Sequence, residues 1–349
     1  MVSTMERHMR DAALIPTTII GSMPKPGWLT SEWYSIAENW RLSGPALDEA
    51  FDDATRLALL DQEQAGIDIV CDGEQRRPSH HSYFLAHLNG VDFKTMKPKA
   101  RRGGTTLQDV PCVVGPLSLR SHRTLADYRF LRALTGKPIK MTLPGPSTLV
   151  DGVFDAYYGD ERALACAFAD ALREEVGALA AAGCDMVQLD EPAVTRLPEK
   201  LHAWGVEALD RALQGVRVIT CVHVCYGYST RQRGGKQWKH GYDEILPALA
   251  RAKVDQCSLE FAEPELPAKL LAMLPDKTIQ LGVINVGSEQ IETPERVAER
   301  LLAALEVVPA QRLIAAPDCG CTALPRTVAR AKLDAMVAGT KLVRARLDA

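Results

Sequence analysis

The chain has 349 residues, 46% of them hydrophobic, and its 41 Lys and Arg against 44 Asp and Glu give a formal net charge of −3. Such a length and apolar content allow one large core, and the near balance of charge, without a long basic run, argues against nucleic-acid binding. No stretch approaches the roughly 18 consecutive apolar residues that a membrane-spanning helix needs.

The N-terminal part of the chain begins with a polar segment, 1–13, which is expected to be loose and which lacks the apolar centre of a signal peptide. A strand is predicted over 14–22 and runs into a loop rich in glycine and proline. Apolar residues at helical spacing then predict a helix over 46–65, ended by Gly66. A second strand is predicted over 67–74 and finishes in polar residues.

Residues 75–137 show weaker periodicity and predict an insertion after the second strand. Within it lie a polar loop at 75–81, a candidate helix at 83–88, a basic stretch at 94–102 and a strand-like run at 110–115. We expect this insertion to cover one mouth of the fold.

Regular alternation of strands and helices returns after the insertion. Strands are predicted at 138–143, 185–192, 218–227, 254–260, 278–286 and 312–317. Helices are predicted at 160–182, 198–213, 242–252, 292–305 and 325–346. Strands that mostly alternate with helices, with no linker or change of composition, predict one α/β domain over 1–349, folded as a single (β/α)8 TIM barrel. A doubly wound open sheet is the alternative, but no G-x-G-x-x-G follows the first strand.

The carboxyl ends of the predicted strands are more polar than their starts. They carry Ser22, Asp72, Glu74, Thr142, Asp190, Glu191, His223, Cys225, Glu260, Asn285, Asp318 and Cys319. In a barrel all these ends open on one face, where active sites lie. Any one of these residues can serve only to cap a helix, but together they predict an enzyme.

The cysteines of the chain bear on its location and on its chemistry. They number nine, which is odd, and no short disulfide framework is apparent, so we expect a cytoplasmic protein with reduced thiols. Cys221, Cys257 and Cys321 are interpreted as structural, whereas Cys225 and Cys319 stand at strand ends.

Four strand-end side chains suit a metal ion, and they are His223, Cys225, Glu260 and Cys319. His223 and Cys225 share one face of their strand because successive side chains alternate. A His-x-Cys pair alone is a weak signal, since core cysteines are common, but the two further ligands strengthen it. Imidazole, thiolate and carboxylate ligands predict Zn²⁺ as the cofactor.

A zinc ion held by two thiolates is well suited to hold a third, deprotonated thiol from a substrate. The predicted chemistry is therefore alkyl transfer to sulfur. The acidic Glu74, Asp190 and Glu191 suit the ammonium group of such a substrate, although Asp190 and Glu191 can equally cap a helix. Ser22 and the backbone at Ile20 are candidates for binding a carboxylate.

These residues resemble a known family, the catalytic C-terminal half of cobalamin-independent methionine synthase. The resemblance extends from about residue 17 to 347 and rests on the runs 18–24, 72–74, 142–146, 188–192, 223–226, 259–260 and 317–320. It implies a TIM barrel with zinc ligands at His223, Cys225, Glu260 and Cys319, and homocysteine contacts at Ile20, Ser22, Glu74 and Asp190. The implied reaction is methyl transfer to a homocysteine thiolate on zinc, which forms methionine.

The chain departs from this family in three respects. It resembles the short form without the N-terminal barrel that helps to hold folate, so the donor is expected to be methyl-folate, a methyl-corrinoid or another carrier, and a partner protein is a further expectation. Gly287 stands where the family has a proton-handling histidine, with His80 and His81 as candidate substitutes. No aromatic residue for stacking on folate is evident after the third strand, where the candidates are Phe154, Tyr157 and Tyr158.

Two other hypotheses remain open from the sequence. One is a zinc-dependent thiol alkyltransferase that uses another thiol acceptor or an electrophile such as an epoxide. It predicts a cationic patch for an anionic acceptor, at Arg76, Arg77 or Arg101. The other is a non-catalytic subunit or methyl-carrier partner whose zinc is structural, closed and inert.

Overall fold

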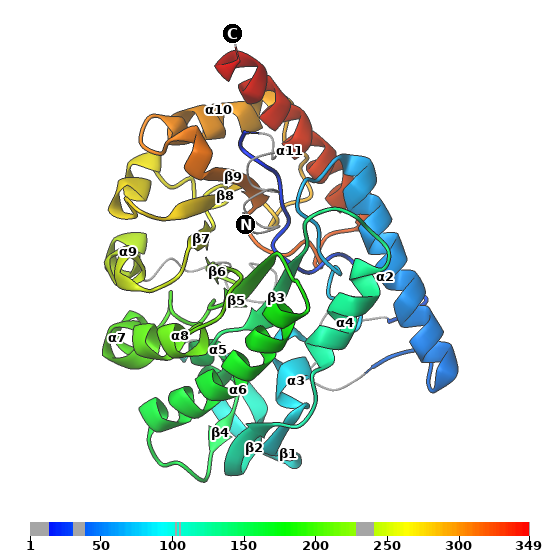
Figure 1. Cartoon of the computed structure of the whole chain (residues 1–349), viewed down its shortest axis with the longest axis vertical. Helices are drawn as coiled ribbons and strands as arrows, with labels where there is room; N and C mark the ends of the chain where they lie inside the picture. The colour runs from blue at the N-terminus through cyan, green and yellow to red at the C-terminus, as the bar shows by residue number, and fades with distance from the viewer. Residues whose placement is uncertain (1–13, 31–38, 102, 105, 228–240, 349) are drawn as a thin grey trace.

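The computed structural model describes residues 14–30, 39–101, 103–104, 106–227 and 241–348 (Figure 1). It is a mixed α/β fold in which helices lie outside a set of parallel strands. The predicted loose segment, 1–13, lies outside the described residues.

Six of the predicted strands form one parallel sheet in the order β3-β5-β6-β7-β8-β9. They are β3 (Lys140–Pro144), β5 (Met186–Asp190), β6 (Ile219–Val224), β7 (Gln256–Leu259), β8 (Thr278–Ile284) and β9 (Leu313–Pro317). Nearly every residue in these strands is buried, as expected for parallel strands covered by helices. Their carboxyl ends therefore lie at one edge of the sheet.

The two remaining predicted strands, at 14–22 and 67–74, are reduced to isolated parallel bridges. The bridges join Thr17 to Ala315 of β9, Thr18 to Ile69, and Val70 to Ile139 just before β3. The first segment cannot extend its ladder because Pro16 has no N–H to donate and Ile15 turns the chain with a φ of 54°. Hydrogen bonds nevertheless connect β9 to the first segment, the first segment to the second, and the second segment to β3, so they join the two edge strands of the sheet.

The helices agree closely with the predicted ranges. They include α2 (Pro45–Ala65), α6 (Glu161–Ala181), α9 (Tyr242–Arg251), α10 (Pro294–Leu305) and α11 (Arg326–Leu347), with short turns η3 (Ala268–Met273) and η4 (Ala310–Arg312). The range predicted as one helix at 198–213 consists of α7 (Pro198–Lys200), η1 (Leu201–Gly205) and α8 (Val206–Ala212) in succession. The start of α6 is fixed by Asp160, whose carboxylate accepts from the first free N–H groups.

The predicted insertion is more regular than its sequence suggested. It contains α3 (His80–Leu85), the antiparallel strands β1 (Leu88–Arg101) and β2 (Thr106–Leu119), and α4 (Arg123–Arg132). β2 also pairs in parallel with the two-residue β4 (Phe154–Asp155), which follows α5 (Pro146–Asp151). The second sheet thus has three strands and lies apart from the parallel sheet.

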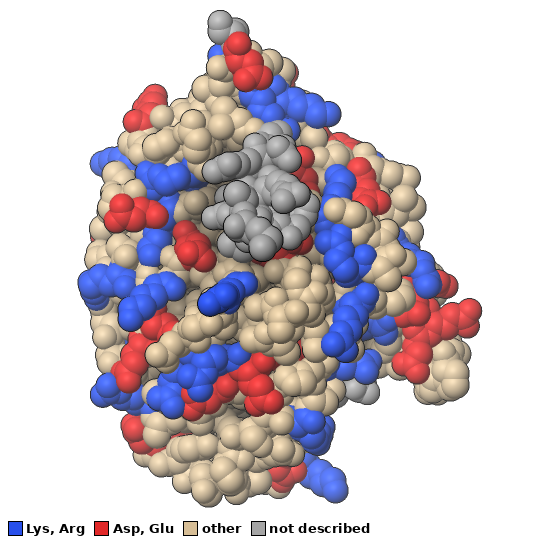
Figure 2. All heavy atoms as spheres, viewed as in Figure 1, with Lys and Arg blue, Asp and Glu red and all other residues tan. Residues whose placement is uncertain are grey.

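One large cluster of buried apolar side chains, from Ile15 to Val343, joins the sheet to the surrounding helices. The face in Figure 2 carries acidic and basic side chains intermixed, in keeping with the balanced charge. None of the helices in the described ranges combines the length and the apolar character needed to cross a bilayer.

Candidate active site

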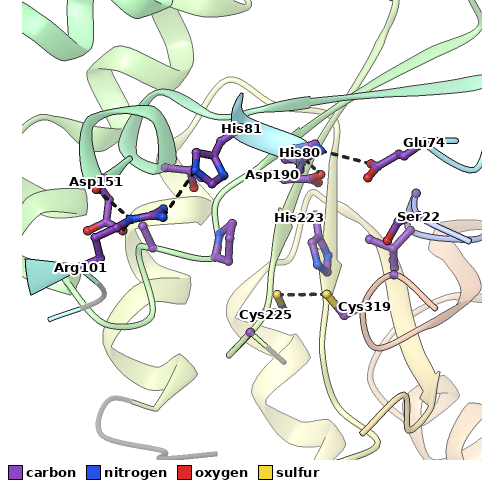
Figure 3. A pocket seen from close by; sticks show the side chains of 17 residues that line it. Ser22, Glu74, His80, His81, Arg101, Asp151, Asp190, His223, Cys225 and Cys319 are labelled. Carbon is purple, nitrogen blue, oxygen red and sulfur yellow. Dashed lines mark hydrogen bonds and ion pairs between the residues drawn. The ribbon is translucent and has the colours of Figure 1, made fainter. Parts of the chain in front are cut away.

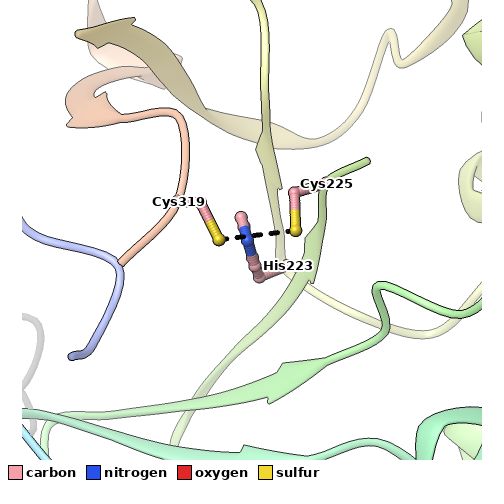
Figure 4. A group of neighbouring side chains, drawn as sticks. All are labelled: His223, Cys225 and Cys319. Carbon is pink, nitrogen blue, oxygen red and sulfur yellow. Dashed lines mark hydrogen bonds between the residues drawn. The ribbon is translucent and has the colours of Figure 1, made fainter. Parts of the chain in front are cut away.

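Two thiols and an imidazole meet at the carboxyl end of the parallel sheet (Figure 4). His223 and Cys225 come from the end of β6, and Cys319 follows β9. One ligand atom from each lies within 4.8 Å of the others, and the two Sγ atoms are 3.5 Å apart. All three side chains are buried. The structure therefore brings together three of the four predicted zinc ligands.

His223 is oriented by the neighbouring strand. Its Nδ1 is 3.0 Å from the hydroxyl of Ser258, which lies opposite it in the register of β6 and β7. Its Nε2 is buried and has no hydrogen-bond partner in the described structure. A buried imidazole nitrogen without a partner is costly unless something occupies it, and a metal ion would do so. Sequence analysis did not single out Ser258, although strand alternation places it on the same face as Glu260.

The fourth predicted ligand, Glu260, does not join this group of three. It follows β7 and is fully buried, and its Oε2 accepts a hydrogen bond of 2.7 Å from the backbone N–H of Tyr226. The loop that carries it is fixed by Asp318, whose carboxylate accepts from the backbone N–H groups of Phe261, Ala262 and Glu263. Because Asp318 directly precedes Cys319, one carboxylate ties the Glu260 loop to a thiol of the cluster.

The pKa of the Cys319 thiol lies well above its usual range. The hydrogen bond with Cys225 raises it, and burial raises it further. Burial disfavours the Cys319 thiolate because it removes the water that would solvate the negative charge. A bound divalent cation would reverse that balance, since it stabilises thiolates directly.

A second cluster contains two of the predicted homocysteine contacts (Figure 3). His80, the first residue of α3, lies between the carboxylates of Glu74 and Asp190. Its Nδ1 is 3.2 Å from Glu74 Oε1 and its Nε2 is 2.9 Å from Asp190 Oδ2. These are ion-pair distances, but neither nitrogen has the alignment of a hydrogen bond. The imidazole therefore faces one carboxylate with each edge of its ring.

The charge of His80 is set by its surroundings. Burial by itself lowers the pKa of His80, but the charges of Glu74 and Asp190 outweigh it and raise the pKa to about 10. Burial likewise raises the pKa of Glu74, but His80 and Arg77 together hold it well below its usual range. The imidazole therefore stays protonated at neutral pH. A protonated ring cannot accept a proton, which disfavours His80 as a general base. His81, the other candidate, faces away toward Arg101, 3.5 Å from a guanidinium nitrogen.

Glu74 is held in an unusual backbone conformation. It has a φ of 55° and follows Gly73, with a φ of 65°, so the chain turns left-handed over two residues after the second predicted strand. Its Oε1 accepts a 2.7 Å hydrogen bond from the Thr142 hydroxyl. A Cβ at Gly21 would lie 2.6 Å from the same oxygen, so only glycine leaves room for the carboxylate there.

The remaining predicted contacts, Ile20 and Ser22, lie beside these carboxylates and line the same pocket. Gln188 links the two regions, because its amide nitrogen donates to the Ile20 carbonyl at 2.9 Å and to Asp190 Oδ1 at 2.7 Å. The carbonyl of Ser22 accepts from Cys321 N at 2.7 Å, which fixes this loop against the segment after β9.

Both clusters open into one pocket of about 730 Å³, including the space open to solvent. Its far end is formed by Arg101 of β1 and Asp151 of α5, with the guanidinium Nε 3.3 Å from an Asp151 carboxylate oxygen. Strand ends of the parallel sheet thus form one wall, and the insertion contributes part of the other.

Comparison with known proteins decides the family. The family model described as the catalytic domain of cobalamin-independent synthase matches residues 15–342. The chain belongs to this family. A methionine synthase from Sulfurisphaera tokodaii is 34% identical over 97% of this chain and 95% of its own length. Another from Saccharolobus solfataricus is 33% identical over 97% of this chain and 98% of its own.

A solved member of the cobalamin-independent family also matches in structure. The B12-independent methionine synthase from Shewanella sp. W3-18-1, in complex with selenomethionine, has a TM-score of 0.91 at 41% identity and covers 96% of this chain and 99% of that chain. These findings confirm the predicted family and the predicted reaction class, a methyltransferase that forms methionine from homocysteine.

Two departures from the family pattern can be located in the structure. Glu263 occupies the space beside Gly287, where an added Cβ would lie 2.6 Å from its Oε1. Phe154, Tyr157 and Tyr158, the candidates for stacking on folate, are not among the residues that line the pocket. The Tyr158 hydroxyl instead accepts from the backbone N–H of Leu117 in β2.

Glu191 has a structural position in this family member rather than a place in the pocket. Its carboxylate accepts from the backbone N–H groups of Ser147 and Thr148 at 2.9 and 2.8 Å, and so caps the start of α5. Gly145 makes room for it, because a Cβ there would lie 2.3 Å from the Glu191 carboxyl carbon. The helix-cap interpretation is therefore the one that the contacts support.

We expect Glu191 to make the stability of the fold depend on pH. Burial raises the pKa of Glu191 to about 7, against backbone hydrogen bonds that lower it. The folded state therefore holds the carboxyl proton of Glu191 more tightly than the unfolded chain does. The stability that this proton contributes to the fold is fully present below about pH 4.5 and is lost as pH rises through 7. In Glu191→Gln the free energy of unfolding, relative to the unmodified protein, should increase by up to about 3 kcal/mol over that range. Urea unfolding at several pH values measures this, and parallel profiles would contradict it.

Proposed function

We propose that the protein transfers a methyl group to the thiolate of homocysteine while zinc is held by His223, Cys225 and Cys319, with Glu260 as the fourth ligand. The observation that carries the proposal is the buried cluster of one unpartnered imidazole nitrogen and two thiols 3.5 Å apart. Nitrogen and sulfur donors at this spacing fit zinc. When bound, zinc would lower the pKa of a substrate thiol and keep it nucleophilic.

The residues around the cluster would prepare it for a ligand. Ser258 holds Nδ1 of His223, so that Nε2 is the nitrogen turned toward the thiols. Tyr226 N holds Glu260 aside from the three other ligands, at a hydrogen-bonding position from which its carboxylate can exchange. Such an exchange would let one position open for the substrate sulfur.

The polar residues of the pocket would orient the amino acid. Glu74 and Asp190 lie where an ammonium group can pair with them, and the Ile20 and Ser22 segment lies beside them for the carboxylate. Recognition of an amino acid would then take place next to the thiol site. The relative from Shewanella was solved with selenomethionine, the selenium analogue of the proposed product.

The proposed methyl donor is a methyl-folate or a methyl-corrinoid carrier, which would approach from the end of the pocket lined by Arg101 and Asp151. The alternative of an anionic acceptor finds less support. Arg77 is buried against Asp72 and Thr142, and Arg76 pairs with Asp52 and Asp127. Arg101 does line the pocket, but Asp151 already partners it.

The way in which the strands connect supports a single active-site face at their carboxyl ends. We infer that eight parallel segments close into a single (β/α)8 barrel domain, since hydrogen bonds such as Thr18 N to Ala315 O and Ile69 N to Thr17 O bridge the sheet edges. The insertion would cover the barrel mouth, because His80, His81 and Arg101 belong to it and line the pocket. Nine free cysteines fit a cytoplasmic location.

X-ray absorption at the zinc edge tests the proposal. Purified protein, with and without homocysteine, should show zinc with two sulfur ligands that gains a third on adding homocysteine. Homoserine, which has a hydroxyl in place of the thiol, is the matched control and should add no sulfur. An unchanged spectrum with homocysteine would favour another thiol acceptor or a structural zinc, and a freshly purified, unchelated sample without zinc would contradict the site.

A further inference from the structure

The proposed ammonium subsite already contains a basic side chain in the structure. The imidazole of His80 contacts both carboxylates that would bind the amino group, Glu74 and Asp190. One oxygen of Asp190 accepts from Gln188 and the other faces His80. On the Glu74 side, the oxygen that faces His80 also contacts Thr142 and Arg77. An incoming ammonium group therefore has to compete with His80 for the Asp190 oxygen.

Charge explains why the subsite is filled when no substrate is bound. Two carboxylates left unpaired in a largely buried pocket would carry a large desolvation cost, and an internal cation offsets it. Both nitrogens of His80 lie at ion-pair distance from a carboxylate oxygen, so the attraction between opposite charges helps to hold the ring there.

We propose that His80 is an internal counter-ion of the ammonium subsite, which the amino group of the substrate displaces on binding. The inference rests on the proposed role of Glu74 and Asp190. The His80 side chain is 19% exposed and lines the pocket, so it has open space into which it can turn. The helix would remain in place, because Ser79 caps it independently through Ser82 N.

Displacement would make the amino group a requirement for opening the site. A thiol that lacks an amino group cannot replace the charge of His80, so the ring would stay between the carboxylates. The pocket would thereby discriminate amino thiols from other thiols by charge exchange, in addition to direct contact. His80 acts in this account as a specificity residue and not as a proton donor or acceptor.

Nuclear magnetic resonance of the zinc-loaded full chain with 15N-labelled histidine tests the displacement. Methionine is the probe, and 4-(methylthio)butanoate, which lacks only the amino group, is its matched control. His80→Gln assigns the signals. We expect methionine to shift the ring signals of His80, and the control compound to leave them unchanged. Methionine binding with no change at His80 would overturn the inference.

The affinity for methionine provides a second, independent measurement. If His80 occupies the subsite in about nine of ten free molecules, His80→Gln should bind methionine about tenfold more tightly, because the competing state is removed. His87→Gln is the control, since His87 lies at the far end of α3 against Ser121, and its affinity should stay unchanged. Equal or weaker binding in His80→Gln would overturn the inference. Methionine failing to bind either protein would overturn it too, and the zinc-edge experiment with homocysteine then shows whether the proposed function fails with it.

Discussion

Replacing Cys319 by serine or His223 by alanine is expected to remove the zinc and the methyltransferase activity together. Each change removes one of three buried ligand atoms that lie within 4.8 Å of one another. Removing a residue that only hydrogen-bonds to a metal ligand weakens metal binding by about 10- to 100-fold. Removing a ligand itself should therefore weaken zinc binding by more than about 100-fold. Zinc content after dialysis against a weak chelator, measured together with methionine formation, checks the expectation.

The control for this experiment is Cys321→Ser, only two residues further along. Cys321 is buried as well, but it is not one of the three residues whose ligand atoms lie within 4.8 Å of one another. Its serine variant should keep the zinc. Cys225→Ser provides the outcome that would contradict the proposal. Full zinc content and full activity in that variant would show that the proposed site is wrong.

Asp190→Asn is expected to separate substrate binding from metal binding. The variant should retain zinc, because Asp190 is not part of the thiol cluster. It should raise KM for homocysteine by about 10- to 150-fold, since a hydrogen bond to a charged group contributes about 1.5 to 3 kcal/mol. Steady-state kinetics and zinc analysis on the same preparation measure both quantities.

Two controls make the result for Asp190 specific. Binding of 4-(methylthio)butanoate should be the same in both proteins, because it offers no amino group to the missing carboxylate. Glu191→Gln alters the adjacent residue, which caps α5 and does not line the pocket, and its KM should stay within about twofold. A KM in Asp190→Asn equal to that of the unmodified protein would remove Asp190 from the amino-acid subsite.

The strands and the thiol cluster were predictable because their signals are local. Apolar runs that end in polar residues mark parallel strands, and strand alternation puts His223 and Cys225 on one side. The first two strands, predicted over 14–22 and 67–74, are confirmed only as isolated parallel bridges within those ranges. Directly after Val70 the backbone N–H and C=O of Cys71 bond to the side chain of Gln62, a pairing that hydrophobic spacing does not reveal.

The sequence could not predict which partners the buried carboxylates would bond to. Glu260 was placed correctly at a strand end, but only the structure shows its bond to Tyr226 N. His80 was named only as a candidate proton-handling residue, whereas its contacts depend on a carboxylate more than a hundred residues away. Of the hairpin, only the run 110–115 inside β2 was predicted, and β1 was missed because much of it is exposed, which removes the alternation that marks a strand.

The left-handed turn at Glu74 bears on how this pocket could be redesigned. A residue with a side chain costs about 1 to 2 kcal/mol in that region of backbone space, and glycine avoids the cost. Glu74 adopts this conformation with a φ of 55°, so the backbone at this position is more strained than it would be with glycine. A library that varies the acceptor subsite can therefore admit glycine or asparagine at position 74 with relief of backbone strain.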